Sequence, residues 1–391
     1  MLRLLHTADV HLGARHADLG EAASAQRERQ FAAFRASVDL AIAERVDLFL
    51  VAGDLFDSNV QPRRSVERVA AELARLAEAR IRSVLIPGTH DVYDRSSVYR
   101  AYDLPALAGV RPAEDMVVVL TPSRPWVHLP ALDAVVHGPV FATKRAPHSP
   151  LRDLAAVETP PATWKLGLLH ASVAIPGRTE HDEVVVTVDE IAASGLDYLA
   201  LGHWHSAQAA KAKAVTYAYA GAPEPVAVDQ DRGGKVLLVT LEETDGRRTV
   251  SIDERVVGRT SFQHLDLDAA TVGSQPALVE KLRAMADPDL VLDVRLIGVR
   301  PDELDASPAE IEEALRGAFL RVRVRDASLP ALTEGALPPV ETIAGAFIRN
   351  VEGRIADLEA SGDDPAQREA EELRDVLRLG RLLLAGQEVT L

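Results

Sequence analysis

The chain has 391 residues, of which 47% are hydrophobic, so it can form a large core and is long enough for two or three domains. It contains no cysteine, which excludes disulfide bonds and thiolate zinc sites, so any metal must bind to histidine, carboxylate, amide or hydroxyl groups. The net charge of −16 argues against a broad nucleic-acid-binding surface, but it is compatible with a local basic patch or a metal site.

The apolar runs are too short to cross a membrane. The longest, 116–120 and 236–241, have the length of single strands. At the N-terminus the apolar run meets Asp9, so we expect no signal peptide. The sequence therefore predicts a cytoplasmic protein without a membrane contact.

Strands and helices alternate in the first part of the chain. Apolar runs that stop at glycine, an acidic residue or histidine predict buried strands within 2–11, 48–57, 83–91, 164–172 and 197–205. Apolar residues at helical spacing predict helices over 21–44 and 63–80, and further strands are expected in 116–140 and 214–256. This pattern predicts an α/β (α+β) fold, a mixed β-sandwich flanked by helices.

The pattern changes near Gly258. Strands are expected at 261–268, 290–299 and 320–326, and a helix is expected at 275–287. A second helix should begin at the capping-box sequence Ser307–Glu310 and end near Phe319. We therefore expect a large first domain over 1–257 and a small α+β capping domain over 258–330.

The C-terminal region, 331–391, is predicted to contain a linker and two helices. The segment 329–339 is rich in proline and glycine, and a helix is expected from about 365 to 384. An apolar stripe at spacings of three and four runs through Ile343, Phe347, Val351, Ile355 and Leu358. This stripe fits either docking to a partner or packing onto the protein's own body.

Five of the predicted strands are followed by residues that can bind a metal ion. These residues are Asp9, His11, Asp54, Thr89, His90, His170, His203 and His205. In extended chain, residues two apart point the same way, so Asp9 and His11 could face one ion. Each motif alone is compatible with a turn, a helix cap or a structural histidine. Because strand ends form the ligand crevice of α/β sheets, the whole set indicates a site for two Mn²⁺-type ions and phosphoester hydrolysis.

The order of these motifs carries a family resemblance. The patterns D-x-H, G-D-x-x-D, G-x-H-D, H and G-H-x-H resemble the calcineurin-like metallophosphoesterase superfamily. The sequences HTADVHLG (6–13), AGDLFD (52–57), YLALGHWH (198–205) and YAGAPEP (219–225) are similar to the SbcD-type DNA repair exonuclease family, especially its YhaO-like branch. The similarity covers nearly the whole chain.

The resemblance implies a role for each motif residue. Asp9, His11 and His205 would hold the first Mn²⁺, Asp54 would bridge the two ions, and His170 and His203 would hold the second. His90 would orient the scissile phosphate or act as a general acid. Asp57 and Asp91 would orient histidines, although turn or capping roles fit both equally well.

Thr89 departs from the family pattern, which has asparagine at this position. A threonine hydroxyl is a shorter and weaker donor than an amide oxygen. We therefore expect two metal ions to bind, the second more weakly than the first.

The resemblance also implies partners. It suggests DNA as the substrate in repair and recombination, an SbcC-like coiled-coil ATPase docked on the C-terminal helices, and a homodimer formed through 21–44 or 63–80. Four loop arginines near the motifs are candidate DNA-phosphate contacts: Arg15, Arg95, Arg100 and Arg178. His6, His128 and His137 lie within strand runs, and we expect them to be core groups or to lie near the site.

Two other functions fit parts of the sequence. A phosphodiesterase or phosphatase for a small substrate would use the same core, but it would need neither the second domain nor the terminal helices. A catalytically weak scaffold that regulates an ATPase is supported only by Thr89. The presence of His90 and of the complete first-metal set argues against the scaffold.

Overall fold

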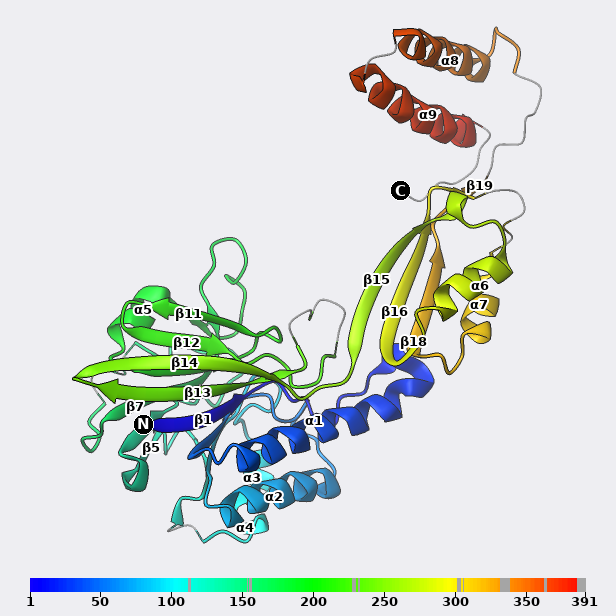
Figure 1. The fold of residues 1–391 in the computed structure, drawn as a ribbon. Coiled ribbons are helices and arrows are strands. Elements are labelled where there is room, and N and C mark those ends of the chain that lie inside the picture. The colour runs from blue at the N-terminus through cyan, green and yellow to red at the C-terminus, as the bar shows by residue number, and fades with distance from the viewer. Residues whose placement is uncertain are drawn as a thin grey trace. The chain divides into compact units, whose positions relative to one another are not determined.

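The computed structural model describes residues 1–111, 114–152, 154, 157–226, 230, 233–300, 304, 306–330, 338–361 and 364–384. The chain divides into two compact units, Met1–Phe262 and Gln263–Leu391 (Figure 1). Most of the predicted linker, 329–339, lies outside the described residues. The finer division into three parts stays a prediction.

The first unit is built on two six-stranded sheets. The first sheet has the order β14 (Arg247–Val256), β13 (Lys235–Thr244), β1 (Leu2–Thr7), β2 (Leu48–Ala52), β3 (Arg82–Ile86) and β4 (Val117–Val119). The second has the order β11 (Gln208–Ala212), β12 (Val215–Tyr219), β10 (Tyr198–Gly202), β7 (Trp164–His170), β6 (Ala134–His137) and β5 (Trp126–Leu129). A short pair, β8 (Ser172–Val173) and β9 (Val185–Val186), follows β7 in the chain.

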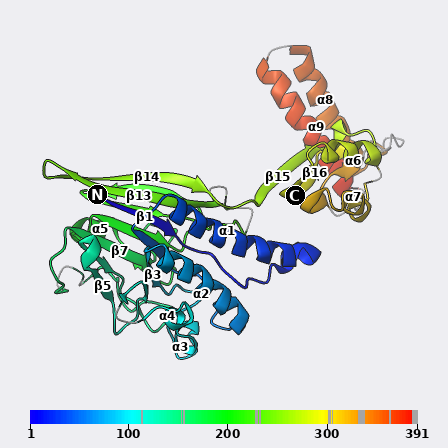
Figure 2. The same ribbon diagram turned by 60° about the horizontal axis from the view of Figure 1, so that its bottom comes forward.

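Helices flank the sandwich. They are α1 (Ala23–Ala43), α2 (Arg63–Glu78), α3 (Val98–Ala101), α4 (Leu104–Leu107) and α5 (Val188–Ala193). Figure 2 shows α1 and α2 side by side along the first sheet. The predicted helices at 21–44 and 63–80 are confirmed, as is the mixed sandwich flanked by helices.

Alternating residues of the first sheet pack into two different hydrophobic cores, one on each face of the sheet. In β2, Phe49 packs toward α1 and α2 together with Phe34 and Leu73. Its neighbour Leu50 packs instead between the two sheets, with residues such as Leu168 of β7. Because side chains alternate across a strand, both faces of the first sheet are buried, which explains why its strands read as continuous apolar runs.

Parallel pairing brings together the strand ends that carry the predicted metal-binding residues. In the first sheet β1, β2 and β3 run parallel, and in the second sheet β7 and β10 run parallel. The carboxyl ends of parallel neighbours meet at one edge of a sheet. Each of these five strands is followed by one of the predicted metal-binding motifs.

The second unit contains a three-stranded sheet with the order β15 (Ser261–Asp268), β16 (Asp287–Ile297) and β18 (Phe319–Asp326). The helices α6 (Gln275–Arg283) and α7 (Pro308–Ala314) share its core, to which Leu278, Ile311 and Val324 contribute. Two short strands, β17 (Val299–Arg300) and β19 (Leu329–Pro330), pair with each other. These elements form the small α+β fold expected from the sequence.

The predicted helix from the Ser307 region is shorter than expected. Ser307 occupies the N-cap position, but its side chain makes no capping hydrogen bond. The Glu310 carboxylate accepts a hydrogen bond from the Gln275 amide at 2.9 Å, so it does not close a capping box. The helix ends at Ala314 because a turn with Gly317 at φ 79° leads directly into β18.

Two C-terminal helices, α8 (Ile343–Ser361) and α9 (Asp364–Leu384), pack against each other. Ion pairs join them, including one between Arg354 and Glu369 at 3.0 Å and one between Arg381 and Glu352. Within the described part of the chain, no helix is both long enough and apolar enough to span a membrane.

A buried polar pair links the two sheets. Nδ1 of His6 in β1 and the hydroxyl of Tyr198 in β10 share a hydrogen bond of 2.8 Å, and both side chains are fully buried. Burial lowers the pKa of His6 to about 3, because a charged imidazolium is poorly solvated between the sheets. The sequence-based expectation of a core histidine is confirmed at this position.

We predict that His6 makes the protein sensitive to acid. Below pH 6.5 the unfolded chain binds a proton at this residue that the folded chain excludes until about pH 3, so stability falls as the pH is lowered through this window. The contribution is at most about 1.4 kcal/mol per pH unit. His6→Gln should therefore show a smaller difference in unfolding free energy between pH 7 and pH 5, measured by urea denaturation. His148→Gln, at an exposed loop histidine, is the control, and equal pH dependence in wild type and His6→Gln would contradict the prediction.

Candidate metal centre

The first cluster at the strand ends contains Asp9, His11 and His205. One ligand atom from each lies within 4.8 Å of the others. The Nε2 atoms of His11 and His205 are 3.1 Å apart, and Nε2 of His205 is 4.0 Å from Oδ1 of Asp9. Asp9 is fully buried and His11 almost so.

A second cluster shares Asp9 and adds Asp54 and His170. Nε2 of His170 lies 3.1 Å from Oδ2 of Asp54, while its Nδ1 donates to the Ala52 carbonyl at 2.9 Å. The same Asp54 oxygen is 3.9 Å from Nε2 of His11. Asp54 therefore lies between the histidines of the two clusters.

His203 and Thr89 complete the surroundings of the second cluster. The backbone N–H of His203 donates to both carboxylate oxygens of Asp9, at 3.0 and 3.1 Å. The His203 and His170 rings meet edge to face, with their centroids 5.2 Å apart. The Thr89 hydroxyl donates to Oδ2 of Asp54 at 3.4 Å, a long hydrogen bond.

A third group, His11, Asp57 and His90, lies at the open side of the site. Oδ1 of Asp57 is 3.2 Å from Nδ1 of His11. The backbone N–H of His90 donates to Asp54 at 2.7 Å, and its Nδ1 donates to the Asp57 carbonyl at 3.1 Å. The His90 side chain is 45% exposed, so Nε2 is left available to a ligand in solution.

The backbone conformation at Asp9 and His11 differs from the extended conformation that we expected from the sequence. We expected Asp9 and His11 to face one ion from extended chain, but β1 ends at Thr7 and both residues have a left-handed backbone, with φ of 52° and 50°. Asp54 and His203 also have positive φ, at 49° and 100°. Such conformations are costly for residues other than glycine and concentrate at functional sites.

Glycines allow the strand ends to approach closely. A Cβ added to Gly53 would clash with the His170 ring, and φ at Gly53 is 86°. A Cβ on Gly88 would overlap Asp54, and a Cβ on Gly202 would overlap the Ala52 carbonyl. The glycine in each of these motifs therefore makes room for a predicted ligand or for the backbone beside it.

Asp91 makes the contacts of a turn residue, the alternative that the sequence left open beside orienting a histidine. Its carboxylate accepts hydrogen bonds from the N–H of Gly88 at 2.6 Å, the N–H of Phe56 at 3.1 Å and the Tyr99 hydroxyl at 2.6 Å. It is fully buried, and burial raises its pKa. Asp91 thus ties the loop after β2 to the loop after β3.

The pKa values of the site residues are shifted because carboxylates and imidazoles are buried close together, away from solvent. Burial raises the pKa of Asp9 to about 6. Burial lowers the pKa of His170, but attraction to Asp54 outweighs it and the net pKa is about 10. Burial and repulsion by His11 lower the pKa of His205 to about 3. His170 and His205 therefore differ widely in proton affinity, although both lie in the same site.

The donor set fits divalent metal ions. Nδ1 of His170 donates to the Ala52 carbonyl, so Nε2 is the ring nitrogen that faces Asp54, 3.1 Å away. The raised pKa of His170 shows that this buried pair favours a positive charge between the imidazole and the carboxylate, and a divalent ion that displaces the proton would supply one. Carboxylates and imidazoles without thiolates suit ions such as Mn²⁺, Fe²⁺ or Zn²⁺.

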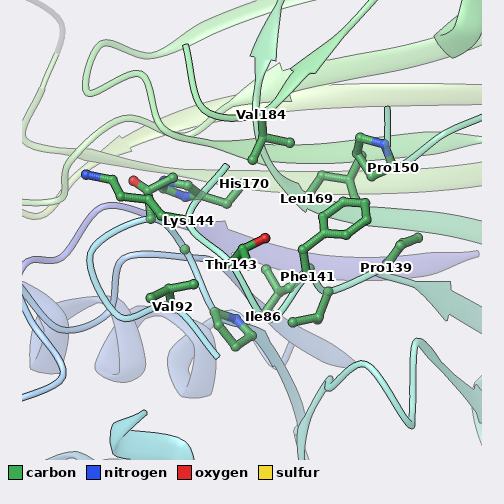
Figure 3. Close-up of a pocket in the computed structure, with 14 residues that line it drawn as sticks. Ile86, Val92, Pro139, Phe141, Thr143, Lys144, Pro150, Leu169, His170 and Val184 are labelled. Carbon is green, nitrogen blue, oxygen red and sulfur yellow. The ribbon is translucent and has the colours of Figure 1, made fainter. Parts of the chain in front are cut away.

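The side of the site next to Thr89 is apolar. A hollow extends from Thr89 and His170 between the loop after β3 and the segment that follows β6, and it is lined by Ile86, Val92, Phe141 and Leu169 among others (Figure 3). Lys144 lies at this hollow, and its Nζ is 3.3 Å from Glu183. Besides Thr89 and His170, the polar residues that line this hollow are Thr143 and Lys144.

The four candidate phosphate contacts are all exposed, but two of them have partners within the protein. The guanidinium of Arg100 lies over the Tyr93 ring at 4.3 Å, and that of Arg178 lies over the Trp204 ring at 5.4 Å. Arg15 and Arg95 are exposed in the loops after β1 and β3.

One contact of the site was missed by sequence reasoning. The Gln230 side-chain amide lies 2.6 Å from Nδ1 of His205. Gln230 is 25 residues away from His205 and belongs to no recognisable motif, so only the fold reveals the contact.

Comparison with known proteins identifies the family. A family model described as calcineurin-like phosphoesterase matches residues 2–207. The chain belongs to this family. Members are metallophosphoesterases, so the predicted resemblance is confirmed, and metal-dependent phosphoester hydrolysis is the chemistry that the fold serves.

Named relatives agree with the narrower resemblance. The DNA double-strand break repair protein Mre11 of Saccharolobus solfataricus is 31% identical over 128 residues, 32% of this chain and 31% of that protein. The uncharacterized metallophosphoesterase YhaO of Bacillus subtilis is 27% identical over 53% of this chain and 49% of its own length. The Mre11 protein of Halobacterium salinarum is 26% identical over 97% of this chain and 89% of that protein. The chain thus spans less than half of the first two relatives and most of the third.

We predict that Asp91 stabilises the site as a structural anchor. Asp91→Asn leaves at least one buried N–H without an acceptor and should lower the free energy of unfolding by about 2–3 kcal/mol. Tyr99→Phe removes a single hydrogen bond and should cost about 1 kcal/mol. Urea denaturation checks both values, with Tyr102→Phe as the matched control. An Asp91→Asn variant as stable as the wild type would contradict this function.

Proposed function

We propose that this chain is a divalent-metal-dependent phosphodiesterase that cleaves DNA, the nuclease subunit of a DNA repair complex. The observation that carries the proposal is the pair of Asp/His clusters that share Asp9 and are connected by Asp54. Two ions held a few ångströms apart are suited to phosphodiester hydrolysis.

The ligand assignment follows the two clusters. Asp9, His11 and His205 would hold one ion, His170, His203 and Thr89 would hold the other, and Asp54 would contribute to both. When bound, the ions polarise the phosphoester and stabilise the charge that develops during attack by water. The family resemblance favours Mn²⁺. The protein's contribution is to keep these side chains in place through the carbonyl, carboxylate and amide groups that hold the other ring nitrogens.

His90 is the proposed catalytic residue. Its backbone is fixed to Asp54 and its Nδ1 to the Asp57 carbonyl, while Nε2 remains accessible. In this position the imidazole contacts the scissile phosphate and donates a proton to the departing oxygen. Oδ1 of Asp57 lies 3.2 Å from Nδ1 of His11 and 3.8 Å from Nδ1 of His90, so it is close to both rings.

Several features support DNA and a protein partner. Two of the named relatives are DNA double-strand break repair proteins. Arg15 and Arg95 are exposed in the loops that follow β1 and β3, the strands that carry two of the motifs, and we propose them as phosphate contacts. The helical pair α8–α9 leaves Ile343, Val376 and Leu383 exposed, which suits docking of an SbcC-like coiled-coil ATPase. A homodimer through α1 or α2 and a cytoplasmic location complete the proposal.

Loss of His90 should abolish cleavage while the fold remains intact. His90→Ala should reduce Mn²⁺-dependent cleavage of end-labelled linear DNA by about 10²- to 10⁴-fold, because a positioned proton donor is removed. His148→Ala, at an exposed loop histidine, should keep full activity.

A generic phosphodiester reporter, assayed in parallel, separates the candidate substrates. Turnover of the reporter without cleavage of DNA would point to a small-molecule phosphodiesterase. Absence of both activities in the wild type, with or without an ATPase partner, would favour a scaffold and overturn the proposal.

The substitution at Thr89 predicts two ion sites of unequal affinity. Titration of the metal-free protein with Mn²⁺ should show one tight site and a second that is weaker by about tenfold or more, because a hydroxyl replaces the usual amide oxygen. Thr89→Asn should bring the two affinities closer, whereas Thr89→Val should weaken the second site further. Two equally tight sites that do not respond to Thr89→Asn would rule out this explanation.

A further inference from the structure

A hydrogen-bond network that belongs to none of the sequence motifs lies beside His203. The indole Nε1 of Trp204 donates to the Ser172 hydroxyl at 3.1 Å. The Ser172 hydroxyl donates in turn to Oδ2 of Asp182. The same carboxylate oxygen lies 3.9 Å from Nε2 of His203. The network therefore connects the residue that follows His203 to the imidazole of His203 itself.

Tyr219 fixes the middle of this network. Its hydroxyl accepts a hydrogen bond from the Val173 N–H at 2.7 Å and donates to the Ala171 carbonyl at 3.0 Å, so both neighbours of Ser172 are held. Its ring also stacks on Trp204, with centroids 5.0 Å apart and planes 12° apart. Ser172 is fully buried, and its hydroxyl has little freedom to choose other partners.

Asp182 is presented by an ordered turn. Its backbone N–H donates to the Thr179 carbonyl at 3.1 Å. The Thr179 hydroxyl, which is buried, accepts from the Ile175 N–H at 2.9 Å and so closes the turn from the other side. The Asp182 side chain is only 27% exposed. The fold therefore holds the Asp182 side chain beside His203, and this side chain does not move freely at the surface.

The direction of the network is fixed by the chemistry of its members. An indole N–H can only donate, so Ser172 must accept from Trp204 and must give its own proton to Asp182. The carboxylate then remains an acceptor, and at 3.9 Å its charge favours a proton on Nε2 of His203 over one on the more distant Nδ1 without a direct hydrogen bond. A neutral ring protonated at Nε2 carries its lone pair on Nδ1.

We propose that Asp182 is a positioning residue that holds His203 in the tautomer offering Nδ1 to a divalent ion, and that Trp204 and Ser172 hold Asp182 in place. The inference rests on the proposed function only for the assignment of His203 as a metal ligand. Carboxylates that hold the second nitrogen of a ligating histidine fix its orientation and raise its basicity. Asp182 and Ser172 thereby connect the strand end that carries His170 to the turn that carries His203.

Mn²⁺ affinity tests the proposal without using activity. Isothermal titration of the metal-free, full-length chain should show that Asp182→Asn raises the dissociation constant of the second, weaker site by about 10- to 100-fold. The first site should be unchanged. Glu183→Gln is the matched control, because it removes the same charge from the neighbouring residue, whose carboxylate pairs with Lys144 at 3.3 Å. Ser172→Ala should cause a smaller loss, and Asp182→Glu should restore part of the affinity.

A tautomer measurement separates positioning from a merely structural function. In the metal-free protein, the ¹⁵N shifts of the His203 ring should show the Nε2-protonated form in the wild type and a mixture in Asp182→Asn. A structural function would lower the thermal midpoint of the metal-free protein without moving either the tautomer or the affinity. A folded Asp182→Asn variant with wild-type affinity, or a wild type without a second Mn²⁺ site, would overturn the proposal. If the variant fails to fold, Ser172→Ala decides by the same two readouts.

The inference and the proposed function fail in different ways. Loss of the second site in Asp182→Asn, together with a wild type that cleaves no DNA, would reject the substrate and support the positioning function. DNA cleavage by the wild type, together with an unaltered second Mn²⁺ site in Asp182→Asn, would support the proposed function and reject the positioning function of Asp182.

Discussion

The arrangement of the site depends on the burial of one carboxylate, that of Asp54. It is 2% exposed and faces the backbone N–H of His90, the hydroxyl of Thr89 and Nε2 of His170. A buried carboxylate needs such partners, because each uncompensated charge costs several kcal/mol. The ends of β2, β3 and β7 are therefore drawn together around a single side chain, and the clustering of the remaining ligands follows from that convergence.

This convergence has consequences for the backbone. Strand ends can approach so closely only where glycine removes a Cβ, as at Gly53, Gly88 and Gly202. The turns that follow must reverse direction within one or two residues, which places Asp9 and Asp54 in left-handed conformations. The two packed cores of the sandwich keep these strained turns in place, since local strain persists only where its surroundings are rigid. The sandwich thus provides the preorganisation that a metal centre needs.

The sequence predicted the strands well because buried parallel strands are continuous apolar runs with abrupt polar ends. It also predicted which side chains would gather, but partly for the wrong reason: Asp9 and His11 converge through left-handed turns, which spacing alone cannot reveal. For Asp91 the sequence left an orienting role and a turn role open, and the structure favours the second, because Asp91 binds backbone amides of two loops whose proximity is a property of the fold. Ser172 and Trp204 gave no signal at all, because a buried serine and an aromatic residue beside a strand are common in any core.

Each candidate histidine ligand has one ring nitrogen committed to the protein or close to a group that can hold it. The groups are the Ala52 carbonyl for His170, the Asp57 carboxylate for His11, the Gln230 amide for His205 and the Asp182 carboxylate for His203. The other nitrogens are thereby left for the centre of the site. On the side of Thr89, a hydroxyl replaces an amide, and most residues that line the neighbouring hollow are apolar. Affinity for an ion on that side must therefore depend more strongly on how well His170 and His203 are oriented.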